Sequence, residues 1–221
     1  MNGQAPPRGN QEHRARHTAP PIVILAGGRS TRMGGGDKCL VKLSGRTILA
    51  HLIDRLSPQT DHMALNANGD VDRFDDFGLT VLPDTCGDYL GPLAGALAAL
   101  KWAASTKPSC RWVQLVSCDT PFVPKDLCAR LQERGADQPD ADIVAPAARG
   151  RTHLLCGLWH TRQIEPLERA LIKDGVRAVR QWTDGRTLLE VDFAADIYDP
   201  FFNVNRPEDL RCAEAILTQL V

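Results

Sequence analysis

Short apolar runs and amphipathic stretches alternate along the first two thirds of the chain. The run PIVILAGG at 21–28 is continuously apolar, which is typical of a strand buried in a parallel sheet. The segment TILAHLIDRLSPQ at 47–59 carries its apolar residues at helical spacing and ends near Pro58. The same patterns predict further strands over 62–69, 79–84, 112–121 and 141–146, and helices over 91–105 and 124–135. This alternation predicts a parallel sheet covered by helices.

The last third of the chain has a less regular pattern. It predicts strands over 154–160 and 187–193, and helices over 163–175, 176–185 and 207–220. We therefore expect a single α/β domain over residues 21–221, with a three-layer, Rossmann-like, mostly parallel sheet and helices on both faces. Residues 1–20 contain Pro, Gly, Gln, Arg and His in place of an apolar pattern, and we expect them to form a disordered tail.

Composition narrows the classes of function. The chain has 221 residues and a formal net charge of −1, which argues against a broad nucleic-acid or membrane surface. No apolar run approaches the roughly 20 residues of a membrane span, and the N-terminal segment lacks the apolar centre of a signal peptide. The seven cysteines include no CxxC pair, so we expect neither a zinc site nor a disulfide framework. The expected location is a reducing compartment, the cytoplasm.

The stretch VILAGGRSTRMGGGDKCLVKL at 23–43 concentrates glycines and cations after the first predicted strand. In open α/β sheets, ligands bind outside the carboxyl ends of the strands, and glycine N–H groups can surround an anion there. Arg29, Arg32 and Lys38 add positive charge, so the stretch predicts a polyphosphate site. Its spacing fits neither GxxxxGK[ST] nor GxGxxG. The alternative is a flexible connection with incidental charge.

Asp119 follows the apolar strand WVQLVS and stands just before Thr120 and Pro121. A carboxylate at this position is suited to Mg²⁺, which prefers oxygen ligands and retains several waters. One protein carboxylate suffices when substrate phosphates supply further oxygens. Asn205 is a candidate second contact. For both residues the alternative is an ordinary turn role.

Five segments together resemble the molybdenum cofactor guanylyltransferases (MobA) of the nucleotidyltransferase superfamily. They are LAGGRSTRMGGGDK (25–38), NAN (66–68), DYLGPLAG (88–95), CDTPF (118–122) and FNVNRPEDL (202–210). LAGG alone is only moderately specific, whereas LAGG combined with CDTP and NVNxPE is highly specific. The resemblance covers about residues 22 to 210.

The resemblance implies transfer of GMP from GTP to the terminal phosphate of Mo-molybdopterin, with Mg²⁺ as cofactor and pyrophosphate as the second product. Guanine needs both an oxygen acceptor and N–H donors, which the backbone of 25–27 can supply. The expected GTP contacts are Leu25, Ala26, Gly27, Lys38, Asn66, Asp84 and Asp119. The expected catalytic residues are Lys38, Arg32 and Asp119, with Asp119 also the metal ligand. The expected acceptor-side residues are Asn203 and Asn205.

The resemblance also names partners and leaves alternatives open. Beyond the two substrates, it implies transient contacts with MobB and with apo-molybdoenzymes, and we expect neither nucleic acid nor membrane as a partner. The alternatives are a cytidylyltransferase for the same cofactor, another small nucleotidyltransferase, and a non-catalytic nucleotide-binding regulatory module. LAGG and CDTP in place of LAAG and GDMP argue against the first. The chain departs from the family pattern at Cys39, and at Leu154 and Leu155, where Pro and Thr are usual.

Overall fold

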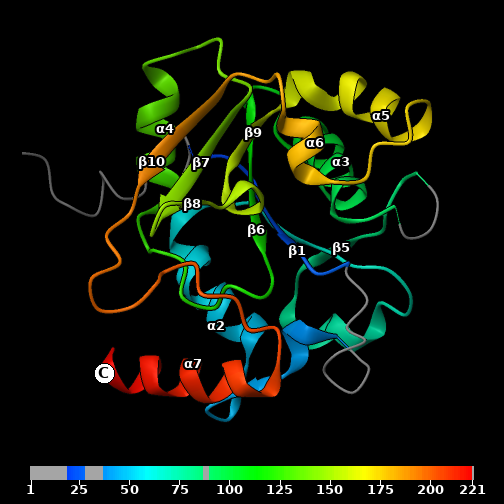
Figure 1. The fold of residues 1–221 in the computed structure, drawn as a ribbon. Helices are drawn as coiled ribbons and strands as arrows, with labels where there is room; N and C mark the ends of the chain where they lie inside the picture. The colour runs from blue at the N-terminus through cyan, green and yellow to red at the C-terminus, as the bar shows by residue number, and fades with distance from the viewer. Residues whose placement is uncertain (1–18, 28–36, 87–89, 221) are drawn as a thin grey trace, which may run out of the picture.

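The computed structural model describes residues 19–27, 37–86 and 90–220 (Figure 1). Within these ranges the chain forms one eight-stranded sheet in the order β10-β7-β9-β6-β1-β4-β5, with β8 paired to β7. The strands of the main sheet are β1 (Ile22–Leu25), β4 (Met63–Asn66), β5 (Thr80–Leu82), β6 (Trp112–Ser117), β7 (Ile143–Ala148), β8 (Arg151–Thr152), β9 (Leu158–His160) and β10 (Leu188–Asp192). A separate two-stranded hairpin consists of β2 (Lys42–Leu43) and β3 (Arg46–Thr47).

The centre of the sheet is parallel, and its register aligns three strand ends. β1 pairs in parallel with both β4 and β6, so that Leu25 lies opposite Asn66 on one side and Ser117 on the other. β5 continues the parallel order beyond β4. The polar residues that follow these strands therefore gather at one edge of the sheet, as expected for parallel strands.

Helices cover both faces of the sheet, as predicted (Figure 1). The elements that pack on one face are α2 (Ile48–Leu56), α4 (Leu127–Ala136) and α7 (Pro207–Gln219). Those that pack on the other are α3 (Pro92–Thr106), α5 (Ile164–Ile172) and α6 (Val179–Thr183). Alternate residues of β1 enter the two cores: Ile22 and Ile24 lie in the first, and Val23 and Leu25 in the second. The predicted mostly parallel three-layer α/β fold is thus confirmed.

Two local predictions differ from the structure. The segment 154–160 was expected to be one strand, but Leu154–Cys156 is a 3-10 turn, and only β9 is extended. β9 runs antiparallel to β6 and β7. The Cys156 N–H closes the turn by donating to the carbonyl of His153 (2.9 Å), and the buried Gln114 side chain donates to the carbonyl of Cys156 (2.9 Å). The hairpin of β2 and β3 was not predicted, because two-residue strands carry no detectable alternation.

The described chain begins two residues before the predicted domain boundary. Ala19 and Pro20 are buried, and their carbonyls accept hydrogen bonds from Lys107 Nζ and Thr60 Oγ1, both at 2.9 Å. These two residues therefore pack against the rest of the described fold. The rest of the expected tail, 1–18, lies outside the described residues.

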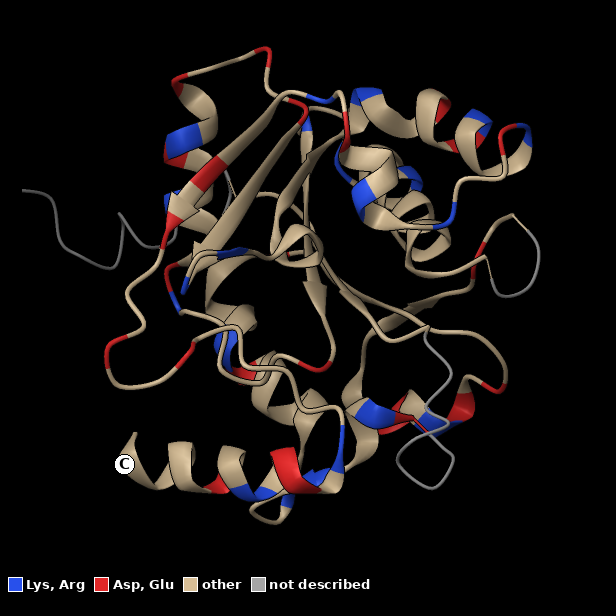
Figure 2. Cartoon of the chain, in the orientation of Figure 1, with Lys and Arg blue, Asp and Glu red and all other residues tan. Residues whose placement is uncertain are grey.

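Charged residues lie mainly on the helices and loops around the sheet (Figure 2). Both signs occur on the same elements, in line with the net charge of −1. No helix in the described ranges is long and apolar enough to cross a bilayer.

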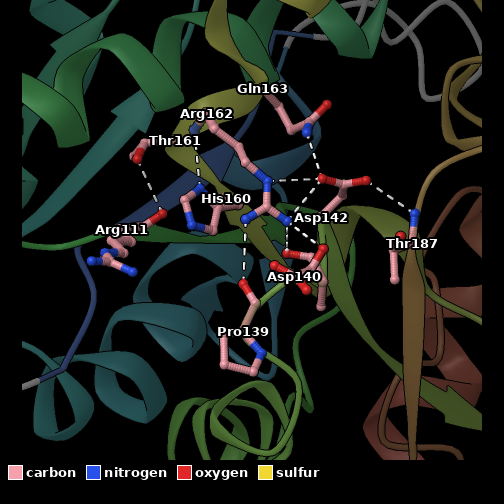
Figure 3. A network of polar contacts seen from close by, with 10 residues as sticks. Arg111, Pro139, Asp140, Asp142, His160, Thr161, Arg162, Gln163 and Thr187 are labelled. Atoms are coloured by element: carbon pink, nitrogen blue, oxygen red, sulfur yellow. Dashed lines mark hydrogen bonds and ion pairs between the residues drawn. The ribbon is translucent and has the colours of Figure 1, made fainter.

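A polar network centred on Arg162 lies at the amino ends of β7 and β10, away from the carboxyl ends of the parallel strands (Figure 3). The guanidinium donates to Asp142 Oδ1 (3.0 Å) and to three backbone carbonyls of 139–141. Asp142 also accepts from Gln163 Nε2 (2.7 Å) and the Thr187 N–H (3.0 Å). Because each of these groups already has partners at the amino ends of β7 and β10, we interpret the network as structural.

Candidate active site

A cavity of about 390 Å³ opens at the carboxyl ends of β1, β4 and β6. The residues lining it are Leu25, Ala26, Gly27, Lys38, Asn66, Asp84, Gly91, Pro92, Ser117, Cys118, Asp119 and Leu155. They include every residue for which a GTP contact was expected from the sequence. Arg32, expected to be catalytic, lies outside the described residues.

At one end of the cavity, two asparagines hold the carboxylate of Asp84. Asn66 Nδ2 donates to Asp84 Oδ1 (3.0 Å) and to the carbonyl of Leu82 (3.0 Å). Asn68 Nδ2 donates to Asp84 Oδ2 (2.8 Å), and its Oδ1 accepts from the Asp84 N–H (2.9 Å). Sequence analysis assigned no role to Asn68, although its spacing of two from Asn66 placed both at one strand end. The result is a carboxylate acceptor of fixed orientation.

The backbone after β1 is partly committed to the sheet. The Ala26 N–H donates to the carbonyl of Asn66 (2.8 Å), and the Leu25 carbonyl accepts from the Cys118 N–H (3.1 Å). The Ala26 N–H thus extends the ladder between β1 and β4, and the expectation that the backbone of 25–27 supplies both donors and acceptors to guanine stays a prediction.

Two glycines allow close packing around Asn66. A Cβ built on Gly27 would lie 3.1 Å from Asn66 Oδ1. A Cβ on Gly95, in the first turns of α3, would lie 2.9 Å from Asn66 Cγ and closer still to its Oδ1. Gly91, the residue before α3, has φ of +80°, which a glycine adopts without strain. Gly95 had no individual role among the sequence-based predictions.

At the other end of the cavity, Asp119 has different neighbours at its two oxygens. Lys38 Nζ lies 4.0 Å from Oδ2. Oδ1 accepts from Ser117 Oγ (2.7 Å) and from Asn203 Nδ2 (3.0 Å). Lys38 also donates to Asn205 Oδ1 (2.5 Å). The structure thus brings together four residues singled out from the sequence, Lys38, Asp119, Asn203 and Asn205, and adds Ser117.

Lys38 is anchored through its neighbour Asp37. The Asp37 carboxylate forms an ion pair with Arg73, whose guanidinium also donates to the carbonyl of Asn68 (2.7 Å). Arg73 therefore ties the start of the Lys38 turn to the loop after β4. Arg73, in the 3-10 helix Asp72–Phe77, had no predicted role, because an arginine among several charged residues carries no local signal.

The two cysteines beside the cavity are not candidates for nucleophilic catalysis. Cys39 is fully buried in the core. A hydrogen bond with Cys39 and burial together raise the pKa of the Cys118 thiol well above its ordinary value. A protonated thiol is a poor nucleophile. Among the described residues that line the cavity, the charged side chains are those of Lys38, Asp84 and Asp119.

The donor set suits a hard divalent cation bound by one protein carboxylate. In the described part of the chain, no three His, Cys, Asp or Glu side chains cluster as a metal site. Asp119 lines the cavity and offers carboxylate oxygens, the ligand type that Mg²⁺ prefers. These residues fit a metal whose remaining ligands are phosphate oxygens and water.

Comparison with known proteins places the chain in a family. The model of the MobA-like NTP transferase domain matches residues 22–188. This chain belongs to the MobA-like NTP transferase family. The matched range contains the whole cavity lining, from Leu25 to Leu155, and ends before Asn203 and Asn205.

Individual relatives extend the similarity along the chain. The molybdenum cofactor guanylyltransferase of Rhodopseudomonas palustris (strain BisB5) is 47% identical over 202 residues, covering 91% of this chain and 96% of that protein. The structure of molybdopterin-guanine dinucleotide biosynthesis protein A from Archaeoglobus fulgidus superposes with a TM-score of 0.71 at 22% identity, covering 90% and 99% of the two chains. The structure of 2-C-methyl-D-erythritol 4-phosphate cytidylyltransferase from Thermus thermophilus gives 0.66 at 17% identity, covering 90% and 99%. The fold is thus shared by proteins named for different bases, so the base must be argued from the site.

Proposed function

We propose that this protein transfers GMP from GTP to the terminal phosphate of Mo-molybdopterin and releases pyrophosphate. The observation that carries the proposal is one cavity with a fixed carboxylate, Asp84, at one end and the Lys38–Asp119 pair at the other. Its volume of about 390 Å³ falls in the range of roughly 300–1,000 Å³ usual for small-molecule sites. The name of the 47% identical relative supports this reaction over its alternatives.

The Asp84 end is assigned to the base. Guanine presents N1–H and N2–H₂ on one edge, and a carboxylate can accept from both. Asn66 and Asn68 hold the Asp84 carboxylate through one oxygen each, which sets its direction before the nucleotide arrives. The backbone of Gly27 lies beside them and is assigned to the O6 edge.

The Asp119 end is assigned to the phosphates. Lys38 offsets negative charge that develops on the pyrophosphate as it leaves. Mg²⁺, held by Asp119 and by phosphate oxygens, would supply further charge neutralisation at this end. The acceptor phosphate is mostly ionised near neutral pH, because its second pKa is about 6. The reaction therefore needs positioning and charge stabilisation rather than a general base.

The remaining expectations are proposals of the same kind. We propose that residues 21–221 act as one nucleotidyltransferase domain, with Ala19 and Pro20 added to it. Cytoplasmic location is supported by the seven cysteines, all of which are free thiols. GTP and Mo-molybdopterin are the proposed substrates, with MobB and apo-molybdoenzymes as transient partners.

Pyrophosphate release with each of the four NTPs, with and without molybdopterin acceptor and Mg²⁺, tests the proposal. We expect release that requires the acceptor and is fastest with GTP. Preference for CTP would instead support a cytidylyltransferase. Tight GTP binding with no release under any condition would support the non-catalytic module and overturn the proposed reaction.

A further inference from the structure

A second cavity adjoins the nucleotide cavity across Asp119. Its volume is about 200 Å³, and it shares Ser117 and Leu155 with the first cavity. It also includes Asn203, which donates to Asp119 Oδ1, whereas Lys38 lies on the Oδ2 side in the first cavity. Asp119 itself lines the first cavity, and the second is lined by Ser117 and Asn203, the two residues that donate to Asp119 Oδ1.

The geometry of in-line displacement indicates which side of Asp119 the leaving pyrophosphate occupies and which side the attacking phosphate occupies. The attacking and leaving oxygens lie roughly opposite each other at the phosphorus. With pyrophosphate leaving on the Lys38 side, the attacking phosphate must approach from the side of Asn203. The second cavity opens on that side, so an acceptor in it would carry its phosphate toward Asp119.

The walls of the second cavity carry unneutralised positive charge. Arg151, from β8, and Arg180, from α6, both line it. Neither guanidinium forms an ion pair with another described residue. Planar guanidinium groups bind phosphate and other anionic oxygens with two hydrogen bonds, and they stack on flat rings.

A buried histidine adds an unsatisfied polar group to the same wall. His153 lines the second cavity, is 8% exposed, and stacks on Phe201 at 4.7 Å between ring centres. Its Nε2 has no hydrogen-bond partner among the described residues. Burial lowers the pKa of His153, which favours the neutral ring. A neutral imidazole can exchange one hydrogen bond with a heterocyclic ligand without adding charge.

A third cavity, with a volume of about 450 Å³, adjoins the second. It shares Thr152, Leu154 and Arg180 with the second cavity. The second cavity alone is smaller than the roughly 300 Å³ at which small-molecule sites begin, so a ligand of that class would extend into the third. Arg180 stands at the junction of the two.

We propose that the second and third cavities bind the acceptor, a phosphomonoester of a flat polar heterocycle, and that Arg180 is its principal charged contact. The inference rests on the proposed function and adds to it the site and residue that select the second substrate. Leu155 lines both the nucleotide cavity and the second cavity, whereas Leu154 lines the second cavity and the third.

Steady-state pyrophosphate release by wild type, Arg180→Ala, Arg180→Lys and Arg169→Ala tests this inference. Arg169 is a matched control, because it is also exposed but lines none of the cavities described above. With GTP saturating, we expect Arg180→Ala to raise the KM for molybdopterin about tenfold or more, the loss of one charge-assisted contact. The KM for GTP should stay within twofold, Arg180→Lys should recover part of the loss, and Arg169→Ala should match wild type.

A second substitution separates ligand contact from packing. His153→Phe keeps an aromatic ring against Phe201 but removes the nitrogen, so it should raise the KM for the acceptor while leaving GTP affinity unchanged. An unaltered acceptor KM in Arg180→Ala, or an equal rise in both KM values, would overturn the inference while leaving the proposed function intact. Failure of the wild type to release pyrophosphate with acceptor present would remove the proposed function, and this inference with it.

Discussion

Replacing Gly95 with alanine tests how the base end of the cavity is assembled. The added Cβ would lie 2.9 Å from Asn66 Cγ and closer still to Oδ1. Asn66 is 2% exposed, so its carboxamide has little room to rotate away. We expect the side chain to be displaced, with loss of its hydrogen bonds to Leu82 and Asp84.

The size of the effect follows from those two bonds. A neutral hydrogen bond contributes about 0.5–1.5 kcal/mol and one to a charged group about 1.5–3 kcal/mol. Alanine is favoured over glycine inside a helix by about 1 kcal/mol, which offsets part of the loss. The free energy of unfolding should therefore fall by about 1–3 kcal/mol, which lowers Tm by roughly 3–10 °C for a domain of this size. GTP affinity should fall at least about tenfold, because Asp84 loses one of its two amide donors.

A double-mutant cycle decides whether Gly95 acts through Asn66. GTP affinity is measured by calorimetry, and Tm by thermal denaturation, for wild type, Gly95→Ala, Asn66→Ala and the double variant. If the alanine acts by displacing Asn66, the double variant should bind GTP no more weakly than Asn66→Ala alone. Wild-type affinity in Gly95→Ala, or two losses that add in full, would refute the reasoning.

Three further predictions concern charge. Asp119→Asn should leave Tm within a few degrees of the wild-type value but reduce the rate of pyrophosphate release about a hundredfold or more. Excess Mg²⁺ should not restore this rate. Wild-type turnover in the variant would contradict the assignment of Asp119. Lys38→Ala should lower both GTP affinity and turnover, measured by calorimetry and pyrophosphate release, whereas an effect on Tm alone would indicate a structural role. Burial lowers the pKa of His160 to about 4 from an ordinary 6.5, so the stability contributed by its neutral ring is complete above pH 6.5 and is lost toward pH 4. In urea titrations, wild type should therefore lose about 1–2 kcal/mol more than His160→Asn between pH 7 and pH 5, and equal losses would refute this cause.

The sequence was most informative where a residue stands at the end of an apolar run. Leu25, Asn66 and Asp119 could be placed at one edge, because parallel strands bring their carboxyl ends together and each run was short and continuously apolar. Asp84 could be placed at the same end of the sheet for the same reason. The order of strands could not be deduced, because nothing in a strand's own residues states which strand pairs with it.

Most of the contacts that orient these residues could not be predicted from the sequence. Asn68, Ser117 and Arg73 act on partners 16, 2 and 36 residues away, respectively, at distances set by the assembled sheet. The 3-10 turn at 154–156 was read as strand because three apolar residues preceding a strand fit either state. Gln114, on β6, donates to this turn from 42 residues away, a contact that the local pattern cannot indicate.

The link between Lys38 and Asn205 spans 167 positions of the chain. The last strand of the described sheet, β10, ends at Asp192, so the residues of every described strand precede Asn203 and Asn205 in the chain. A nascent chain released only up to that strand would possess Lys38 and Asp119 without the two amides that contact them. The end of the cavity at Lys38 and Asp119 is thus completed by residues that are translated after those of every described strand.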